Sequence, residues 1–69
     1  MKISARNSYA GKITHLKEGP VSTEVTIEIA PAVNMVSVIT THSAKALGLK
    51  VGMSSYAIVK ADNVIVGVD

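Results

Sequence analysis

The chain contains no cysteine, no phenylalanine and no tryptophan, and its only aromatic residues are Tyr9 and Tyr56. The lack of cysteine excludes disulfides as well as zinc or iron–sulfur sites built on thiolates. The two histidines, His15 and His42, have no second histidine or carboxylate at ligand spacing. We therefore expect no site for a metal cation, and the absence of a recognisable nucleophile, base and orienting acid argues against an enzyme.

Large side chains are scarce in a chain of 69 residues, yet its hydrophobic fraction is 48% and is carried mainly by valine, isoleucine and alanine. A single domain of this size, residues 1–69, buries only about 60% of the surface that its unfolded chain exposes. The apolar surface is too large to leave in water, and the side chains that form it are too small to make a deep core. We therefore expect the chain to bury surface against other copies of itself.

Long apolar runs and blocks of like charge are also missing. The formal net charge is +2 and the sequence pI is about 9.2, without consecutive Lys or Arg residues. No window approaches the roughly 18 apolar residues of a membrane span, and near the N-terminus Lys2 and Arg6 are followed by no apolar run long enough for a secretory signal. The sequence predicts a soluble, cytoplasmic protein without a membrane partner.

Period-two alternation is clearest over residues 21–29, where apolar residues and Thr23 alternate with polar ones, and it predicts a strand with one buried face. Residues 3–7 and 11–18 read as earlier strands, either separate or joined as one element bent at Gly11. Gly19-Pro20 is expected to form a turn, and residues 33–39 a third strand. Because proline fixes φ, a turn at Pro31-Ala32 cannot place a positive φ at Pro31.

A short helix is predicted over residues 44–48, after the capping residues Thr40 to Ser43 and with Gly48 at its C-terminal end. Residues 54–60 and 63–68 are expected to form the last two strands. The final one is apolar on both faces, so we expect it to lie centrally in a barrel or against a partner subunit. The order of these elements along the chain predicts an all-β protein. We expect a small OB-fold-like barrel of five to six strands with one short helix between the third and fourth strands.

Hydrogen-bond donors suited to an anion occur in three places. In a strand, Ser4 and Arg6 would share a face, with a hydroxyl beside a guanidinium. Thr40 and Ser43 flank a helix start whose free amides favour negative charge, and Lys60 ends an apolar strand. Each has a plainer interpretation: a solvated strand face with Arg6 paired to a glutamate, an ordinary N-cap, and an exposed edge lysine.

The segment Ser4-Ala5-Arg6-Asn7, followed by Gly11-Lys12-Ile13, resembles the opening of the molbindin or Mop family. Thr40 and Ser43 match a Ser/Thr pair around the helix start of that family, and Lys60-Ala61 matches its lysine at the end of the penultimate strand. The resemblance covers the whole chain. It implies a domain that binds molybdate or tungstate at subunit interfaces of a homohexamer, a trimer of dimers, without an organic cofactor.

On this basis the predicted oxyanion-binding residues are Ser4, Ala5, Arg6, Asn7, Thr40, Ser43, Lys60 and Ala61, and the loop residues Gly19, Val21 and Ser22 are a possible second oxyanion site. The resulting interpretation is intracellular storage and homeostasis of molybdate and tungstate. Two alternatives stay open: a small OB-fold protein that binds single-stranded nucleic acid, and a structural or regulatory oligomer without active anion sites. The first is disfavoured because two tyrosines provide few surfaces for base stacking.

Overall fold

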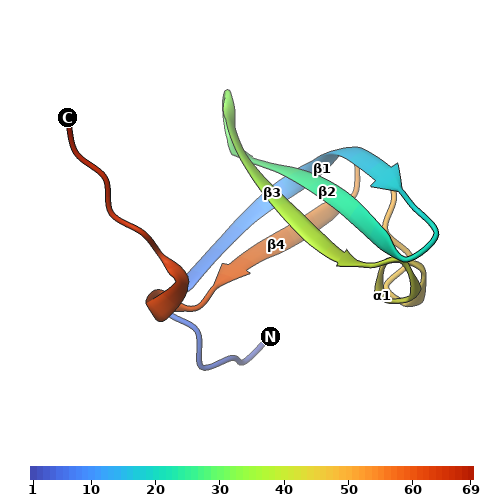
Figure 1. The fold of residues 1–69 in the computed structure, drawn as a ribbon, viewed down its shortest axis with the longest axis horizontal. Coiled ribbons are helices and arrows are strands. Elements are labelled where there is room, and N and C mark those ends of the chain that lie inside the picture. Colours follow the sequence, from blue (N-terminus) through green and yellow to red (C-terminus); the bar gives the residue numbers. More distant parts are fainter.

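The computed structural model describes all residues from Met1 to Asp69 as one curled antiparallel sheet with a short helix at one end (Figure 1). The strands lie in the order β3-β2-β1-β4. The elements are β1 (Asn7–Glu18), β2 (Ser22–Ala30), β3 (Val33–Thr40), α1 (Thr41–Ala46), β4 (Ser54–Val59) and the 3-10 turn η1 (Ala61–Asn63). The all-β class and the helix between the third and fourth strands are confirmed, with four strands rather than five or six. Neither helix has the length and apolar character needed to span a membrane.

The strand β1 is one bent element that pairs with two neighbours. Its first half, from Asn7 to Lys12, pairs with β4, and its second half pairs with β2, with a register shift between Ile13 and His15. At Gly11 a β-carbon would lie 2.5 Å from the carbonyl oxygen of Glu28. The backbone of β2 therefore leaves no room for a side chain at residue 11, and glycine fits there. Residues 3–6 precede the strand, and the prediction of a strand over 3–7 is therefore wrong.

The core is small, as the side-chain composition predicted. Alternation along β2 buries Thr23, Val25 and Ile27, and the apolar cluster is completed by Ile13 and Ala57. Only 7 of the 69 residues are buried. The alternation prediction is wrong at Val21, which is 77% exposed because β2 begins one residue later and Val21 belongs to the preceding turn.

The β2–β3 connection is a two-residue turn, since Ala30 pairs with Val33 across it. Its positive φ of 61° falls on Ala32 and not on Pro31, as the fixed φ of proline requires. A proline followed by a residue with positive φ is the pattern of a type II turn, in which glycine is the favoured second residue. Ala32 therefore holds a conformation that costs an L-residue free energy.

The helix α1 begins at Thr41, three residues before the predicted start, because Thr40 is its N-cap. The Thr41 hydroxyl donates to the carbonyl oxygen of Gly19 at 2.6 Å and lies 2.8 Å from the Thr23 hydroxyl. The Thr41 amide donates to the carbonyl of Val21 at 2.9 Å. These bonds fasten the start of the helix to the β1–β2 turn, and Thr41 is consequently buried.

The predicted strand over residues 63–68 does not form. After β4 the chain enters η1, and residues 64–69 have no strand partner and lead away from the sheet (Figure 1). A strand needs the free edge of another strand to hydrogen-bond its backbone groups. The segment that follows η1 runs in a direction in which its own chain offers no such edge. As a result both edge strands, β3 and β4, pair on one side only.

Candidate oxyanion site

Two segments from the ends of the chain meet in one hollow. Ser4, Ala5 and Arg6 line it together with Lys60, Ala61 and Asp62, and its volume is about 250 Å³. The pairing of Asn7 with Val59 brings the segments together, because β1 begins where β4 ends. Five of the predicted site residues therefore share one hollow, although Ser4 and Arg6 reach it from outside a strand.

The charge of the hollow is mixed but mainly positive. Arg6 and Lys60 contribute two cations, and Asp62 contributes one carboxylate. The Lys60 Nζ lies 4.0 Å from Asp62 Oδ2, with both side chains 74% exposed. An ion pair so exposed is worth little, so Lys60 is free to exchange this partner for an anion. Sequence reasoning missed Asp62, and its position two residues after Lys60 was the available signal.

Asn7 and Tyr9 lie next to this hollow but do not line it. They line an adjoining hollow with the apolar side chains of Ile29, Met35, Val59 and Val64. Asn7 is half-buried and is the first residue of β1. In a single chain it therefore fixes the backbone that carries Arg6, and its side chain is not one of those lining the oxyanion hollow.

The hydroxyls at the start of α1 form a short relay. Thr40 Oγ1 accepts the Ser43 amide at 3.1 Å and donates to Ser43 Oγ at 2.8 Å. The N-cap interpretation of Thr40 is thus correct. The relay leaves the Ser43 hydroxyl proton available to donate outward from an exposed position. Because α1 has only six residues, its donors here are these hydroxyls rather than a strong helix dipole.

The two donor groups lie at opposite ends of the sheet. Thr40 pairs with Ser22 beyond the end of β1, whereas Arg6 precedes its start. Figure 1 shows α1 at one end and η1 at the other. The 12 residues of β1 separate them, at a rise of roughly 3.3 Å per residue that the bend shortens only in part. Donors from the two ends of one chain cannot contact the same small anion.

The loop proposed as a second site uses its backbone internally. The Gly19 amide donates to the carbonyl of Ser22 at 2.9 Å, and the carbonyls of Gly19 and Val21 accept from Thr41. A hollow of about 280 Å³ adjoins Gly19 and Ser22, but Glu18 and Glu24 line it with a single ammonium, Lys17. Within one chain, two carboxylates and only one cation make this hollow unfavourable for an anion. The second oxyanion site therefore stays a prediction, with weaker support than the site at Arg6 and Lys60.

Comparison with known proteins decides the family. The sequence pattern of the TOBE domain matches residues 3–66. The chain belongs to the TOBE-domain proteins of the molbindin (Mop) type. This Mop domain is 42% identical over 66 residues to molybdenum-pterin-binding protein 2 of Clostridium pasteurianum, covering 96% of the chain and 97% of that relative.

The same domain also occurs inside longer proteins. It is 42% identical over all 69 residues to the molybdenum transport protein ModE of Herbaspirillum seropedicae, but spans only 26% of that relative's length. Among solved structures it is similar to the cytoplasmic molybdate-binding protein ModG with molybdate bound, with a TM-score of 0.94 and 38% identity over 100% of this chain and 49% of that one. The Mop fold is therefore used both alone and as a module.

Proposed function

We propose that this Mop domain binds molybdate, and tungstate alike, in sites shared between copies of the chain, and stores the oxyanion in the cytoplasm without turnover. The observation that carries the proposal is the placement of Arg6, Lys60 and Ser4 around one hollow. Relatives and a solved neighbour named for molybdenum or molybdate support the choice of ligand.

The chemistry of the hollow suits a dianion. Molybdate at neutral pH has oxygens that accept hydrogen bonds and no proton to donate, so it is complemented by donors alone. Arg6 supplies a fixed guanidinium fork, Lys60 a point charge and Ser4 a hydroxyl. Together the two cations balance a charge of −2, once Lys60 leaves Asp62.

A single chain supplies an open half of such a site. All residues lining the hollow are exposed except Ala5, which is half-buried, so water reaches any bound ion and weakens the interaction. A neighbouring copy that presented Thr40 and Ser43 would add hydroxyl donors and exclude water. This arrangement explains why the two donor groups occupy opposite ends of the sheet.

Exposed apolar surface supports assembly independently of any ligand. Large side chains more than half exposed occur on both edge strands and on the C-terminal segment, among them Val36, Val38, Tyr56 and Ile65. Monomeric proteins rarely leave such patches in water. A homohexamer, as a trimer of dimers, is the arrangement that the molbindin resemblance implies, and it is part of this proposal.

The test is a titration of the purified protein with molybdate, tungstate, sulfate and phosphate, combined with the oxyanion content of protein from molybdate-supplemented cells. We expect molybdate and tungstate to bind alike and phosphate hardly at all, because partly protonated phosphate brings a donor into a set of donors. Equal affinity for sulfate and molybdate would instead indicate a generic anion site.

The nucleic-acid alternative loses support from the sheet register. Tyr9 pairs with Ala57, whereas Tyr56 pairs with Ala10 on the neighbouring position of the same two strands. Successive residues of a strand point to opposite faces, so the two tyrosines lie on opposite faces of the sheet. They cannot form one platform on which successive bases would stack.

A further inference from the structure

The carboxylate of Asp62 loses its only charged partner when Lys60 turns to an oxyanion. Lys60 Nζ and Asp62 Oδ2 are 4.0 Å apart, and they form the only ion pair of the chain. The turn η1, which carries Asp62, is closed by a bond from the Asn63 amide to the carbonyl of Lys60 at 3.0 Å. Asp62 therefore stays beside the hollow, where a free carboxylate repels a dianion.

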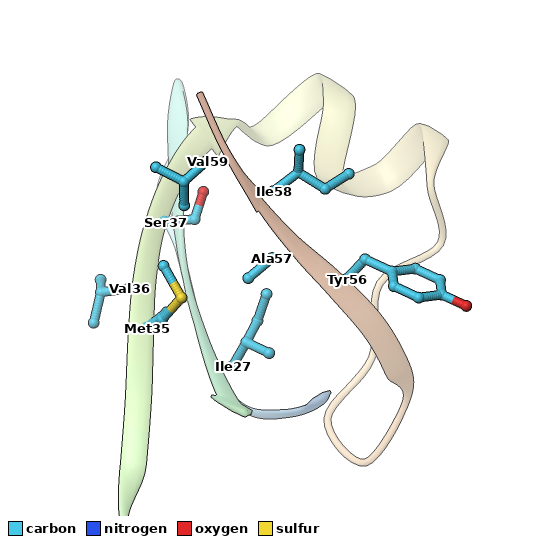
Figure 2. Close-up of a pocket in the computed structure, with 8 residues that line it drawn as sticks. All are labelled: Ile27, Met35, Val36, Ser37, Tyr56, Ala57, Ile58 and Val59. Atoms are coloured by element: carbon cyan, nitrogen blue, oxygen red, sulfur yellow. The ribbon is translucent and has the colours of Figure 1, made fainter. Parts of the chain in front are cut away.

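The chain itself offers Asp62 no second partner. The space between β3 and β4, which adjoins the end of β4, is lined by apolar side chains, among them Met35 and Val59 (Figure 2). In the oxyanion hollow, Arg6 and Ser4 are donors that the ion itself requires. Once a neighbouring copy covers the hollow and excludes water, the carboxylate needs a donor from outside its own chain.

The first turn of α1 carries a side chain that no interaction of its own chain uses. The His42 side chain is exposed and forms neither a hydrogen bond nor an ion pair. Thr41 and Ala44 are buried where α1 packs on β2 and β3, so His42 and Ser43 face outward from this turn. An imidazole has at least one N–H donor in either protonation state, and it is therefore a suitable partner for a carboxylate.

The other charged groups around α1 are placed differently. Lys45 and Lys50 line a separate hollow of about 130 Å³ together with Glu18. The strand β3 contains no ionisable residue, and the first such residue of β2 is another carboxylate, Glu24. His42 is therefore the free donor nearest to the hydroxyls at the helix start.

From these observations we propose that His42 of one copy donates a hydrogen bond to the Asp62 carboxylate of a second copy and holds it away from Lys60 when molybdate binds. This inference rests on the proposed shared site, in which a neighbouring copy presents Thr40 and Ser43 to the hollow. His42 lies between those two residues in the sequence, so it reaches the rim of the hollow together with them. Side chains of a helix lean toward its N-terminal end, so the imidazole is directed to the same side as the two hydroxyls.

His42 is on this account a positioning residue, because it acts on the ion through Asp62. Within one chain the two residues cannot meet. Figure 1 shows α1, which carries His42, at one end of the sheet and η1, which carries Asp62, at the other. A contact between them therefore forms only between copies, and it can be detected without any bound ion.

A cross-link tests the contact in the absence of molybdate. The protein has no cysteine, so His42→Cys and Asp62→Cys can be placed in separate copies and refolded as a mixture. A short bismaleimide should join the unlike copies, whereas His15→Cys in place of His42→Cys should give far less product, since His15 lies within β1. Absence of the cross-link, or a yield equal to that of the His15 control, would overturn the proposal.

A double-mutant cycle, measured by titration with molybdate, tests the effect on the ion. We expect His42→Leu, which removes the donor, to weaken binding about two- to fivefold, the equivalent of an exposed charged pair. His42→Gln keeps an N–H donor and should bind as the parent does. In the Asp62→Asn background, His42→Leu should leave the affinity within about twofold, because no carboxylate remains to be held.

Three results of the cycle would overturn the proposal. An equal loss in both backgrounds would show that His42 acts on the ion directly. Parent-like binding by His42→Leu would show that Asp62 needs no partner, and equal binding by His42→Gln and His42→Leu would show that the donor has no role. A parent protein that binds no molybdate would contradict the proposed function instead, and the cross-link would then decide whether the contact exists.

Discussion

Asn7 and Val59 are paired across β1 and β4, and this pairing sets Arg6 and Lys60 on the rim of one hollow although 53 residues of sequence lie between them. The two cations come from segments immediately outside the paired strands. Their positions therefore depend on the register of two strands rather than on any local motif.

Removing either cation should weaken molybdate binding. Arg6→Ala and Lys60→Ala each leave a desolvated dianion under-compensated, at a cost of about 2 to 5 kcal/mol in binding free energy. Isothermal titration with molybdate measures this once the oligomeric state is confirmed. His15→Ala is the control, because His15 is exposed and its ring is hydrogen-bonded to the neighbouring Thr14 hydroxyl, at 3.2 Å, and not to any residue of the hollow. Parent-like binding by both cation variants would place the site elsewhere.

Asp62→Asn should have the opposite effect. It removes the only carboxylate lining the hollow and frees Lys60 from its exposed partner at 4.0 Å. We expect tighter molybdate binding by about 0.2 to 1 kcal/mol, the value of an exposed ion pair, and a smaller gain at high salt. Asp69→Asn, on a carboxylate at the chain end, is the matched control. Weaker binding by Asp62→Asn would mean that this carboxylate helps to hold the ligand.

Thr41→Val should destabilise the fold through a buried hydrogen-bond network. The substitution keeps the shape but removes the hydroxyl that contacts Gly19 and Thr23 at 2.6 and 2.8 Å. Leaving these buried partners unsatisfied costs about 1 to 3 kcal/mol. Thermal or urea unfolding provides the measurement, with Thr26→Val on the half-buried outer face of β2 as the comparison. A Thr41→Val stability within a few tenths of a kcal/mol of the parent would show that the network is dispensable.

Ala32→Gly should stabilise the protein, which is unusual for a change to glycine. The φ of 61° at Ala32 costs an L-residue roughly 1 to 2 kcal/mol, and glycine removes this cost. The greater freedom of glycine in the unfolded chain opposes the gain by about 0.4 to 1 kcal/mol. We expect a net gain near 0.5 to 1 kcal/mol. The neighbouring Ala30→Gly, at the last residue of β2, should lose stability instead. Equal signs for the two changes would contradict this description of the turn.

Local sequence signals predicted the parts of this fold that local interactions determine. The alternation of Thr23, Val25 and Ile27 indicated the buried face of β2, and the hydroxyl of Thr40 indicated the start of the helix region. The prediction of a strand over 63–68 was wrong for a single chain because strand formation depends on a partner edge, which composition cannot reveal. Val21 looked buried by its spacing, yet it belongs to a turn whose end is set by tertiary bonds to Thr41.

For the candidate site, the sequence predicted residues that do meet at the hollow but not their division between two ends of the sheet. Ser4, Arg6 and Lys60 meet because of strand register, while Thr40 and Ser43 lie at the opposite end. Only the geometry shows that one chain cannot offer all of these donors to one ion, and this separation is the reason for the proposed shared site.

The most direct test of a shared site is complementation between two defective variants. Arg6→Ala and Ser43→Ala chains are refolded separately and as an equal mixture, and molybdate binding is compared by titration. If each site combines Arg6 of one copy with Ser43 of another, some sites in the mixture contain both residues and regain parent affinity. If the mixture binds no better than the average of the two variants alone, the site does not join Arg6 of one copy to Ser43 of another, and a site shared between copies is contradicted.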